Sequence, residues 1–289
     1  MLGYRHAFHA GGGADVLKHT MLVFCLKYLC QKEKAFLYID THAGAGSYDL
    51  AGGYAEQNKE WKTGVAKLME KAGKITQSET PSVINDYLSY TKTAAAYPGS
   101  PALARKILRP RDRIVCYEKH PADFLLLSEL LSHDCGAEAR NADGFEGLKS
   151  LLPPPSRRSC VLIDPSYEMR DDYEKTASAV MEALRRFPTG LYLVWYPLLV
   201  LNGAGETLRD ALMAMYSGNR CCAELITGDK RREIGTKRGG LYGSGLVIYN
   251  PPWTLKAALE ETLPFLADCV SAEHCGYGCQ WIDLRSPAQ

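Results

Sequence analysis

Two periods of hydrophobic residues organise the chain, one typical of helices and one typical of buried strands. From Ala14 to Cys30, apolar residues recur every three or four positions, which predicts a helix. The run from Ala35 to Asp40 is almost entirely apolar, and small residues follow its terminal acid, which predicts a strand and then a loop. Tyr54 to Tyr90 is polar and helical in character and contains no clear strand.

From Arg113 onward, apolar runs alternate regularly with amphipathic stretches. The predicted strands, counting the first at 35–40, are seven in number; the later six are Arg113–Glu118, Ala137–Asp143, Ser159–Asp164, Leu191–Pro197, Cys222–Ile226 and Gly245–Trp253. The predicted helices among them are Pro121–Leu131, Phe145–Leu152, Tyr173–Phe187 and Glu206–Tyr216, with one more before them at Pro101–Leu108. This alternation predicts an α/β fold with a mostly parallel, seven-stranded sheet.

The polar helical segment interrupts this alternation. We therefore expect residues 1–52 and 96–289 to form the core, and residues 53–95 to form a small helical insertion.

Acidic residues stand at the ends of successive predicted strands. Asp40, Glu118, Asp143 and Asp164 each close a strand, and Pro197 closes another. Ligands of parallel sheets bind beyond the carboxyl ends of the strands, where the strand order reverses. One acid there can simply cap the next helix, whereas four in succession favour a polar ligand.

The order of these strand ends matches a fold that binds S-adenosylmethionine. Glycines such as Gly44, in the loop D-T-H-A-G-A-G, let the backbone approach a ligand, although a tight turn also explains them. Glu118 can accept hydrogen bonds from both ribose hydroxyls. Asp143 and Gly144 can hold the adenine edge, and Asp164 then begins the tetrapeptide D-P-S-Y.

Two segments resemble the D-P-P-Y tetrapeptide of adenine-methylating enzymes. D-P-S-Y, Asp164 to Tyr167, follows the fourth strand and lies next to the predicted cofactor loop. N-P-P-W, Asn250 to Trp253, follows the last predicted strand, which is usually antiparallel in this topology. We therefore expect D-P-S-Y to be catalytic and N-P-P-W to be a structural turn.

The chemistry of adenine methylation needs the residue types of D-P-S-Y. The exocyclic amine is a poor nucleophile, so its N–H groups must be drawn into hydrogen bonds and aimed at a methyl group. Asp164 can accept one N–H, and eventually a proton, while the Pro165 carbonyl accepts the other. Tyr167 can stack against the base. Ser166 stands in place of a second proline and reduces the rigidity of the loop. An inactive descendant of such an enzyme is therefore an alternative.

The composition excludes more classes of function than it suggests. The 289 residues are 46% hydrophobic and 23% charged, and the formal net charge of +1 gives no sign of a nucleic-acid partner. Neither an export signal nor a membrane-spanning run is apparent, so we expect a cytoplasmic protein with reduced cysteines. The cluster Cys269, His274, Cys275 and Cys279 lacks paired C-x-x-C halves, and we expect no metal.

Four quoted segments together resemble a known family. Y-R-H-A-F-H-A-G-G-G-A-D-V-L-K-H from Tyr4, D-T-H-A-G-A-G, Y-P-G-S-P from Tyr97 and S-R-R-S-C-V-L-I-D-P-S-Y are similar to the bacterial 23S ribosomal RNA adenine-N6 methyltransferase family RlmJ. The resemblance implies a Rossmann-like class I methyltransferase that uses S-adenosylmethionine. It implies a pocket lined by Lys18, His19, His42, Ser100, Glu118, Asp143, Gly144 and Asp164, with Tyr4 at the entrance touching substrate.

Basic residues give candidate contacts to RNA phosphates. Gly228 to Gly245 is a basic, glycine-rich loop that includes Lys237 and Arg238, and Arg157 and Arg158 precede the catalytic strand. An ordinary solvated loop explains each piece equally well. The expected partner is 23S ribosomal RNA before full ribosome assembly, bound by a monomer.

Three other functions remain open from the sequence. A DNA adenine methyltransferase uses the same chemistry, and only the family resemblance favours RNA. A catalytically weak nucleic-acid-binding protein, linked to the use of external DNA, is compatible with Ser166. A nuclease needs clustered metal-binding carboxylates, and no such motif is evident.

Overall fold

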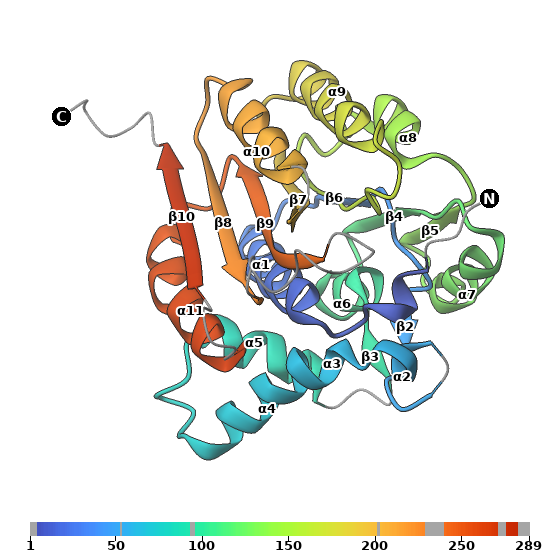
Figure 1. The fold of residues 1–289 in the computed structure, drawn as a ribbon. Helices are drawn as coiled ribbons and strands as arrows, with labels where there is room; N and C mark the ends of the chain where they lie inside the picture. Colours follow the sequence, from blue (N-terminus) through green and yellow to red (C-terminus); the bar gives the residue numbers. More distant parts are fainter. Residues whose placement is uncertain are drawn as a thin grey trace.

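An eight-stranded sheet forms the centre of the computed structural model, which describes residues 5–52, 54–92, 96–200, 203–228, 240–270 and 276–282 (Figure 1). In spatial order, β10-β8-β9-β7-β6-β1-β4-β5, the strands are β10 (Gly276–Ile282), β8 (Arg220–Ile226), β9 (Leu241–Tyr249), β7 (Leu191–Leu199), β6 (Ser159–Ile163), β1 (Leu37–Asp40), β4 (Arg113–Tyr117) and β5 (Ala137–Arg140).

Five neighbouring strands of the sheet run parallel. β5, β4, β1, β6 and β7 share one direction, whereas β9 pairs antiparallel with both β7 and β8. The chain passes from β1 to β4 on one side and later returns to β6 on the other, so the strand order reverses between β1 and β6. This confirms the predicted α/β class with a mostly parallel sheet.

The predicted number of seven strands is wrong, because β10 adds an eighth at the sheet edge. It pairs antiparallel with β8 along its whole length. Its sequence, G-Y-G-C-Q-W-I, contains two glycines and no continuous apolar run, and every residue of the strand is at least partly open to solvent. A strand with one free edge needs no hydrophobic run, so periodicity did not reveal it.

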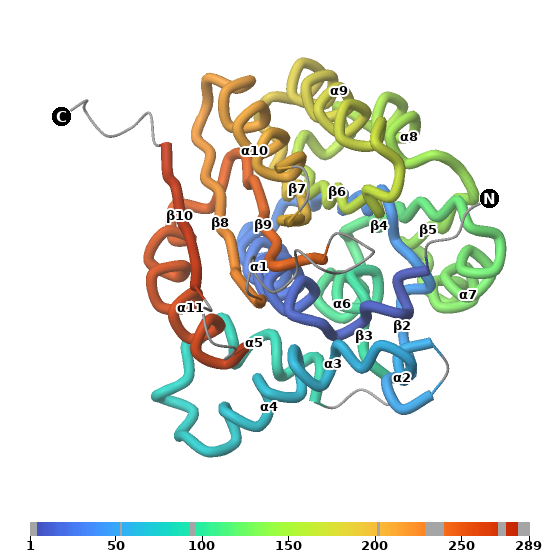
Figure 2. The backbone as a smooth tube through the Cα atoms, viewed as in Figure 1, coloured from blue at the N-terminus to red at the C-terminus, as the bar shows by residue number. Residues whose placement is uncertain are grey.

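Helices cover both faces of the sheet, as the tube in Figure 2 also shows. One face packs against α1 (Gly13–Cys30), α5 (Ser82–Thr91), α6 (Ser100–Ile107), α7 (Pro121–Leu131) and α11 (Leu255–Val270). The other packs against α8 (Gly144–Leu151), α9 (Asp172–Arg186) and α10 (Ala204–Ala214). Successive residues of β1 point to opposite cores, with Tyr38 in the first and Ile39 in the second.

Helix α11 was not predicted from the sequence. Pro264 lies inside it, and proline normally interrupts a helix because it lacks an N–H and clashes with the preceding turn. Burial of Leu259, Leu263 and Leu266 against the sheet overrides that local penalty.

The segment predicted as an insertion contains α2 (Ala55–Asn58), α3 (Glu60–Thr63), α4 (Val65–Lys74) and α5. At its two ends β2 (Ser47–Tyr48) and β3 (Tyr97–Pro98) pair antiparallel, so the chain leaves the core and returns at one place. Ile84 and Tyr87 of α5 are fully buried in the core beside α1. The final helix of this segment therefore shares the hydrophobic core of the sheet.

The carboxyl end of β9 lies at the opposite edge from the carboxyl ends of the parallel strands. Tyr249 pairs with Tyr192 near the start of β7. Asn250, which follows, has a left-handed φ of 52°, and its side-chain amide donates to the carbonyls of Pro188 and Gly190 at 2.7 and 2.6 Å. The prediction that N-P-P-W is a structural turn is confirmed, although β9 is not the last strand.

Candidate functional site

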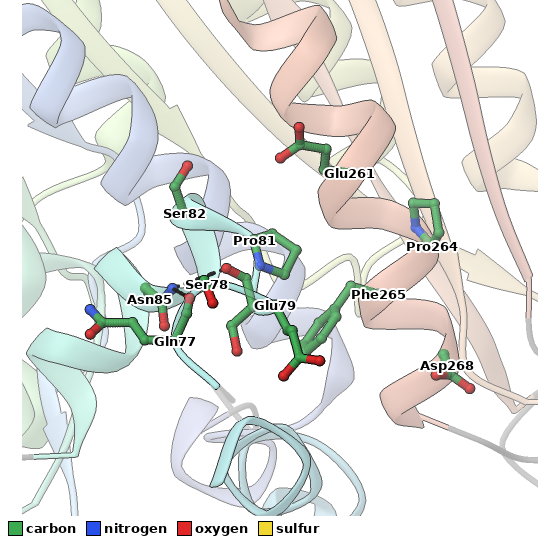
Figure 3. Close-up of a pocket in the computed structure, with 11 residues that line it drawn as sticks. Gln77, Ser78, Glu79, Pro81, Ser82, Asn85, Glu261, Pro264, Phe265 and Asp268 are labelled. Carbon is green, nitrogen blue, oxygen red and sulfur yellow. Dashed lines mark hydrogen bonds between the residues drawn. The ribbon is translucent and has the colours of Figure 1, made fainter. Parts of the chain in front are cut away.

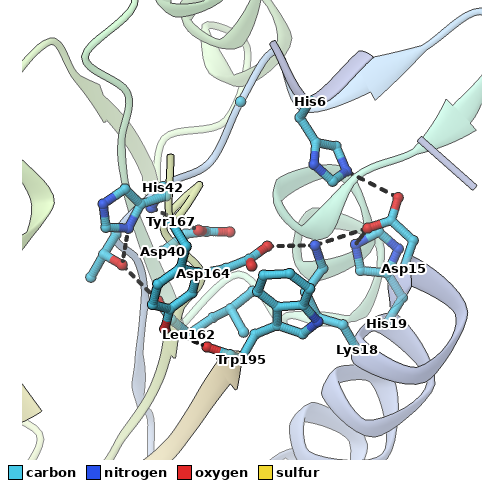
Figure 4. Close-up of polar contacts among 12 residues, drawn as sticks. His6, Asp15, Lys18, His19, Asp40, His42, Leu162, Asp164, Tyr167 and Trp195 are labelled. Carbon is cyan, nitrogen blue, oxygen red and sulfur yellow. Dashed lines mark hydrogen bonds and ion pairs between the residues drawn. The ribbon is translucent and has the colours of Figure 1, made fainter. Parts of the chain in front are cut away.

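The site lies at the carboxyl edge of the sheet, where the order reverses between β1 and β6. Asp40 ends β1, and Asp164 follows β6 on the neighbouring strand. Lys18 reaches this point from α1, and its ammonium lies 2.5 Å from Asp164 Oδ2 and 2.8 Å from Asp15 Oδ1 (Figure 4). The topology thus joins two segments far apart in the sequence, α1 and the loop after β6, in one buried ion-pair cluster near the end of β1.

Lys18 carries its charge in spite of being only 4% exposed. Burial alone would lower the pKa of the ammonium, but the carboxylates of Asp15 and Asp164 outweigh that effect and raise the pKa above its ordinary value. For Asp15, burial would raise the pKa, but His6, Lys18 and His19 outweigh it and hold the pKa well below its usual range. Lys18 and Asp15 are therefore both charged at neutral pH.

His19 lies behind Lys18 and is buried. Its Nδ1 lies 2.9 Å from the hydroxyl of Tyr97, which in turn lies 3.0 Å from the hydroxyl of Tyr87 on α5. Burial lowers the pKa of His19 to about 3, so the imidazole is neutral. Its contacts position it as a link between α1 and α5.

Asp40 is completely buried below the loop that follows β1. It accepts a hydrogen bond of 2.8 Å from the Tyr38 hydroxyl and another from Ser100, at the start of α6. Burial raises its pKa to about 6, since removing water disfavours the carboxylate more than these donors stabilise it. The structure thus brings the predicted residue Ser100 to the end of β1.

The glycine loop and the end of β4 are joined directly. Gly44 has a φ of +60°, which favours glycine, and its N–H donates to Glu118 Oε2 at 2.8 Å. Glu118 Oε1 accepts from the His120 N–H at 2.6 Å. Burial raises the pKa of Glu118. His42 precedes this turn with Nδ1 2.7 Å from Thr41 Oγ1, and burial lowers its pKa to about 4.

Asp143 and Gly144 begin α8. Asp143 accepts hydrogen bonds from the N–H groups of Phe145 and Glu146, so it caps the helix, as the simpler interpretation proposed. Gly144 is required for packing, because a Cβ there would lie 2.0 Å from the carbonyl oxygen of Thr41. This close approach presses the start of α8 against the loop after β1.

The loop D-P-S-Y is held in an unusual conformation. Tyr167 has a φ of 53°, uncommon for a bulky residue, and its hydroxyl donates to the Trp195 carbonyl on β7 at 2.7 Å. The ring lies against Tyr173 and Trp195, with centroids 4.7 and 5.9 Å away, and it is 7% exposed. Trp195 thereby anchors the loop that carries Asp164.

Two predicted substrate contacts lie away from this site. Arg157 and Arg158 precede β6, so they are at the opposite edge of the sheet, with Arg158 about 20 Å from Asp164 along the strand. Arg158 donates to the backbone carbonyls of Lys34 and Leu29 and stacks over Phe36. Its contacts are those of a structural residue, which disfavours the predicted role. Three other predicted residues, Tyr4, Lys237 and Arg238, lie outside the described residues.

Asp15 and Trp195 belong to the site but were not singled out from the sequence. Asp15 lies three residues before Lys18 in the N-terminal motif, which is ion-pair spacing on a helix. That spacing was the available signal. Trp195 was hidden within an apolar strand, where an aromatic residue normally indicates only a core position.

A separate hollow lies between residues 77–85 and α11, distant from these strand ends (Figure 3). Its walls are part polar and part apolar, with acidic residues Glu79, Glu261 and Asp268 around Pro264 and Phe265. None of the predicted site residues lines it. The hollow is therefore not the candidate active site.

Comparison with known proteins agrees with the predicted resemblance. The family model described as "Ribosomal RNA large subunit methyltransferase D, RlmJ" matches residues 33–283. Ribosomal RNA large subunit methyltransferase J of Escherichia coli K12 is 39% identical, over 92% of this chain and 93% of the relative. Its counterpart from Haemophilus influenzae is 36% identical, over 98% and 99%. A crystal structure of a Legionella pneumophila protein superposes with a TM-score of 0.83, at 32% identity, covering 94% of this chain and 98% of that one.

Proposed function

The chain belongs to the RlmJ family of ribosomal RNA large subunit methyltransferases, and we therefore propose that it transfers a methyl group from S-adenosylmethionine to N6 of an adenine in 23S ribosomal RNA. The observation that carries this proposal is the position of Asp164. Its carboxylate begins a D-P-S-Y loop at the strand-order reversal and is paired with a buried ammonium from α1. The Rossmann-like fold agrees with use of this cofactor.

The residues around the reversal fit S-adenosylmethionine. Glu118 uses one lone pair of each oxygen for a backbone N–H, which leaves acceptors for two ribose hydroxyls. The positive φ at position 44 favours glycine, and Gly44 leaves that turn without a side chain. We assign the cofactor pocket to these residues together with Lys18, His19, His42, Ser100, Asp143 and Gly144. When bound, the cofactor supplies an electrophilic methyl group.

Asp164 and Pro165 would prepare the amine. Hydrogen bonds from the two N–H groups to the Asp164 carboxylate and the Pro165 carbonyl orient the nitrogen lone pair and increase its basicity. As the nitrogen becomes cationic, the proton moves to an Asp164 oxygen. Lys18 is paired with Oδ2 of that carboxylate, which leaves Oδ1 to accept the N–H of the adenine.

Tyr167 would supply the surface for the base. Its ring belongs to the same loop as Asp164, and a base withdrawn from its stack needs an aromatic face beside the hydrogen-bonding groups. Ser166 removes one proline from the loop. The Tyr167–Trp195 hydrogen bond offers another restraint, which supports a working catalytic loop.

The proposal extends to the setting in which the chain acts. We propose that the chain acts as a monomer in the cytoplasm, on RNA that is not yet fully assembled. No helix among the described residues is long and apolar enough to cross a membrane. In the same part of the chain, no group of three or more His, Cys, Asp or Glu side chains is arranged to hold a metal ion.

The test is transfer of labelled methyl to three substrates: unmodified 23S ribosomal RNA, assembled large subunits and adenine-containing DNA. We expect label in N6-methyladenosine of the free RNA, and its loss in Asp164→Ala. Label in DNA alone would show that the substrate is DNA and not RNA. Protein that binds the cofactor but labels nothing would support the catalytically weak binding protein.

A further inference from the structure

We propose that Asp15 is a positioning residue of this site, fixing the Lys18 ammonium against Asp164 without touching the reacting atoms. The inference rests on the proposed function, because it assigns a role in the reaction of Asp164. Asp15 was not among the residues predicted from the sequence, and it lies on the far side of Lys18 from the catalytic loop (Figure 4).

Asp15 gathers donors from three parts of the N-terminal motif. Its Oδ2 accepts the Gly11 N–H at 2.9 Å and lies 3.0 Å from His6 Nε2. Its Oδ1 forms the 2.8 Å ion pair with Lys18. The carboxylate is 1% exposed, so its geometry is set by these partners and not by water. A buried carboxylate with several donors is rigid as well as charged.

The position of Asp15 in α1 explains why it stays ionised. Gly12 is the N-cap residue, so Asp15 is third in the helix, where N–H groups and the helix dipole favour an anion. Its bond to the Gly11 N–H reaches back over the helix start, like the acid of a capping box. The helix terminus and the catalytic cluster are therefore held by the same side chain.

Lys18 needs this second anion. A lysine side chain has four rotatable bonds and a compact charge, and burial favours its neutral form. With Asp15 present, the ammonium is clamped between two carboxylates on opposite sides. With Asp164 alone, burial would weigh more heavily and the ammonium would be free to turn about a single contact. Asp164 would then lose the fixed donor on its Oδ2.

Several ionisable groups lie around Lys18. From the packed elements these are Asp15 and His19 of α1, Asp40 of β1, Asp164 after β6 and Tyr87 of α5. Asp40 and Tyr87 have no ion pair or hydrogen bond with Lys18 among the contacts described. Of these groups, Asp15 and Asp164 are the two in direct contact with the ammonium.

The test compares Asp15→Asn with a matched control, Asp112→Asn. The first substitution keeps the shape of the side chain and removes its charge. Asp112 is also buried and accepts from Arg109 and the Phe36 N–H, but it lies before β4 at the opposite edge of the sheet. Both variants lose a buried carboxylate, so both report the structural cost, and only the first alters the contact to Lys18.

We expect Asp15→Asn to lower kcat on 23S ribosomal RNA by about 10- to 100-fold, the scale of a misplaced catalytic group. The activity should also fail at a lower pH on the alkaline side, because Lys18 has lost an adjacent anion. Asp112→Asn should lose thermal stability and keep kcat and its pH profile. An Asp15→Asn enzyme with unchanged kcat and pH profile would overturn the proposal.

A second measurement does not depend on activity or on the folding of Asp15→Asn. In Asp164→Asn, the ¹³Cε resonance of Lys18 is followed from neutral to alkaline pH. We expect Lys18 to remain charged in a single ordered environment, because Asp15 alone still holds it. Titration of Lys18 like an exposed lysine would overturn the role of Asp15. If the wild type methylates nothing, the proposed function fails, and this titration still decides the placement of Lys18.

Discussion

Replacing Lys18 by Met tests whether the ion-pair cluster stabilises the fold as well as the site. The substitution keeps an unbranched chain of similar length and removes the ammonium. It leaves the carboxylates of Asp15 and Asp164, formerly 2.8 and 2.5 Å from Nζ, on either side of an apolar group. Two anions without their shared cation then face each other in a buried place.

The ion-pair distances set the size of the expected loss of stability. At 2.8 Å and an effective dielectric constant of about 20, the attraction between two unit charges is about 6 kcal/mol. Desolvation of the buried ammonium offsets much of this, and loss of one member of a buried pair typically costs about 3–5 kcal/mol. We expect Lys18→Met to lower the free energy of unfolding by about that amount near pH 7.

The pH dependence has a defined sign. In the wild type the pKa of Asp15 is held well below its usual range, so its contribution to stability is present at neutral pH and is lost as the pH falls through that low value. Without Lys18 the depression is smaller, and so is the contribution at neutral pH. The difference between the two proteins should therefore shrink as the pH falls below about 4.

Urea unfolding, followed by circular dichroism, measures the difference. The matched control is Lys175→Met, which removes an ion pair of 2.6 Å to Asp171 whose side chains are each more than half exposed. The control should change stability little, because water screens the pair. A loss for Lys18→Met no larger than that of the control, at every pH, would refute the reasoning.

Two further predictions concern the backbone and the buried acid. Gly144→Ala should destabilise the protein by about 3 kcal/mol, because its Cβ would lie 2.0 Å from the Thr41 carbonyl oxygen. The control Gly73→Ala, whose Cβ would have nothing within 4 Å, should be neutral or stabilising. Thermal unfolding compares the two variants, and equal effects would contradict the close approach at Gly144. Asp40 has a folded pKa raised to about 6, so its ionisation should reduce wild-type stability as the pH rises from about 4 to 6, by up to about 3 kcal/mol. Asp40→Asn should flatten that slope in urea unfolding, and an unchanged slope would contradict burial as its cause.

The order of helices and strands in the core was predictable from the local sequence. β1, β4, β6 and β7 are nearly continuous apolar runs, because both faces of a parallel sheet are covered by helices. The acids at their ends follow from the same rule, since parallel strands bring their carboxyl ends to one edge. The order of the motifs therefore also favoured D-P-S-Y over N-P-P-W as the candidate catalytic loop.

Elements whose stability depends on distant partners were not predictable. β10 is an edge strand without an apolar run, and α11 contains Pro264. Both exist because β8 and the hydrophobic core supply contacts that outweigh weak local preferences. The sequence carries no local signal for such contacts.

Residue type and order along the chain were enough to predict the fold class and the strand-end acids, and to single out D-P-S-Y as the candidate catalytic loop. Which charges meet depends instead on how the elements pack. The packing brought Lys18 from α1 between Asp15 and Asp164, and it placed Arg158 at the far edge of the sheet. A direct ion pair needs its two charges within about 4 Å, so the pairs of this cluster depend on the packing of α1 across the strand-order reversal and not on sequence separation.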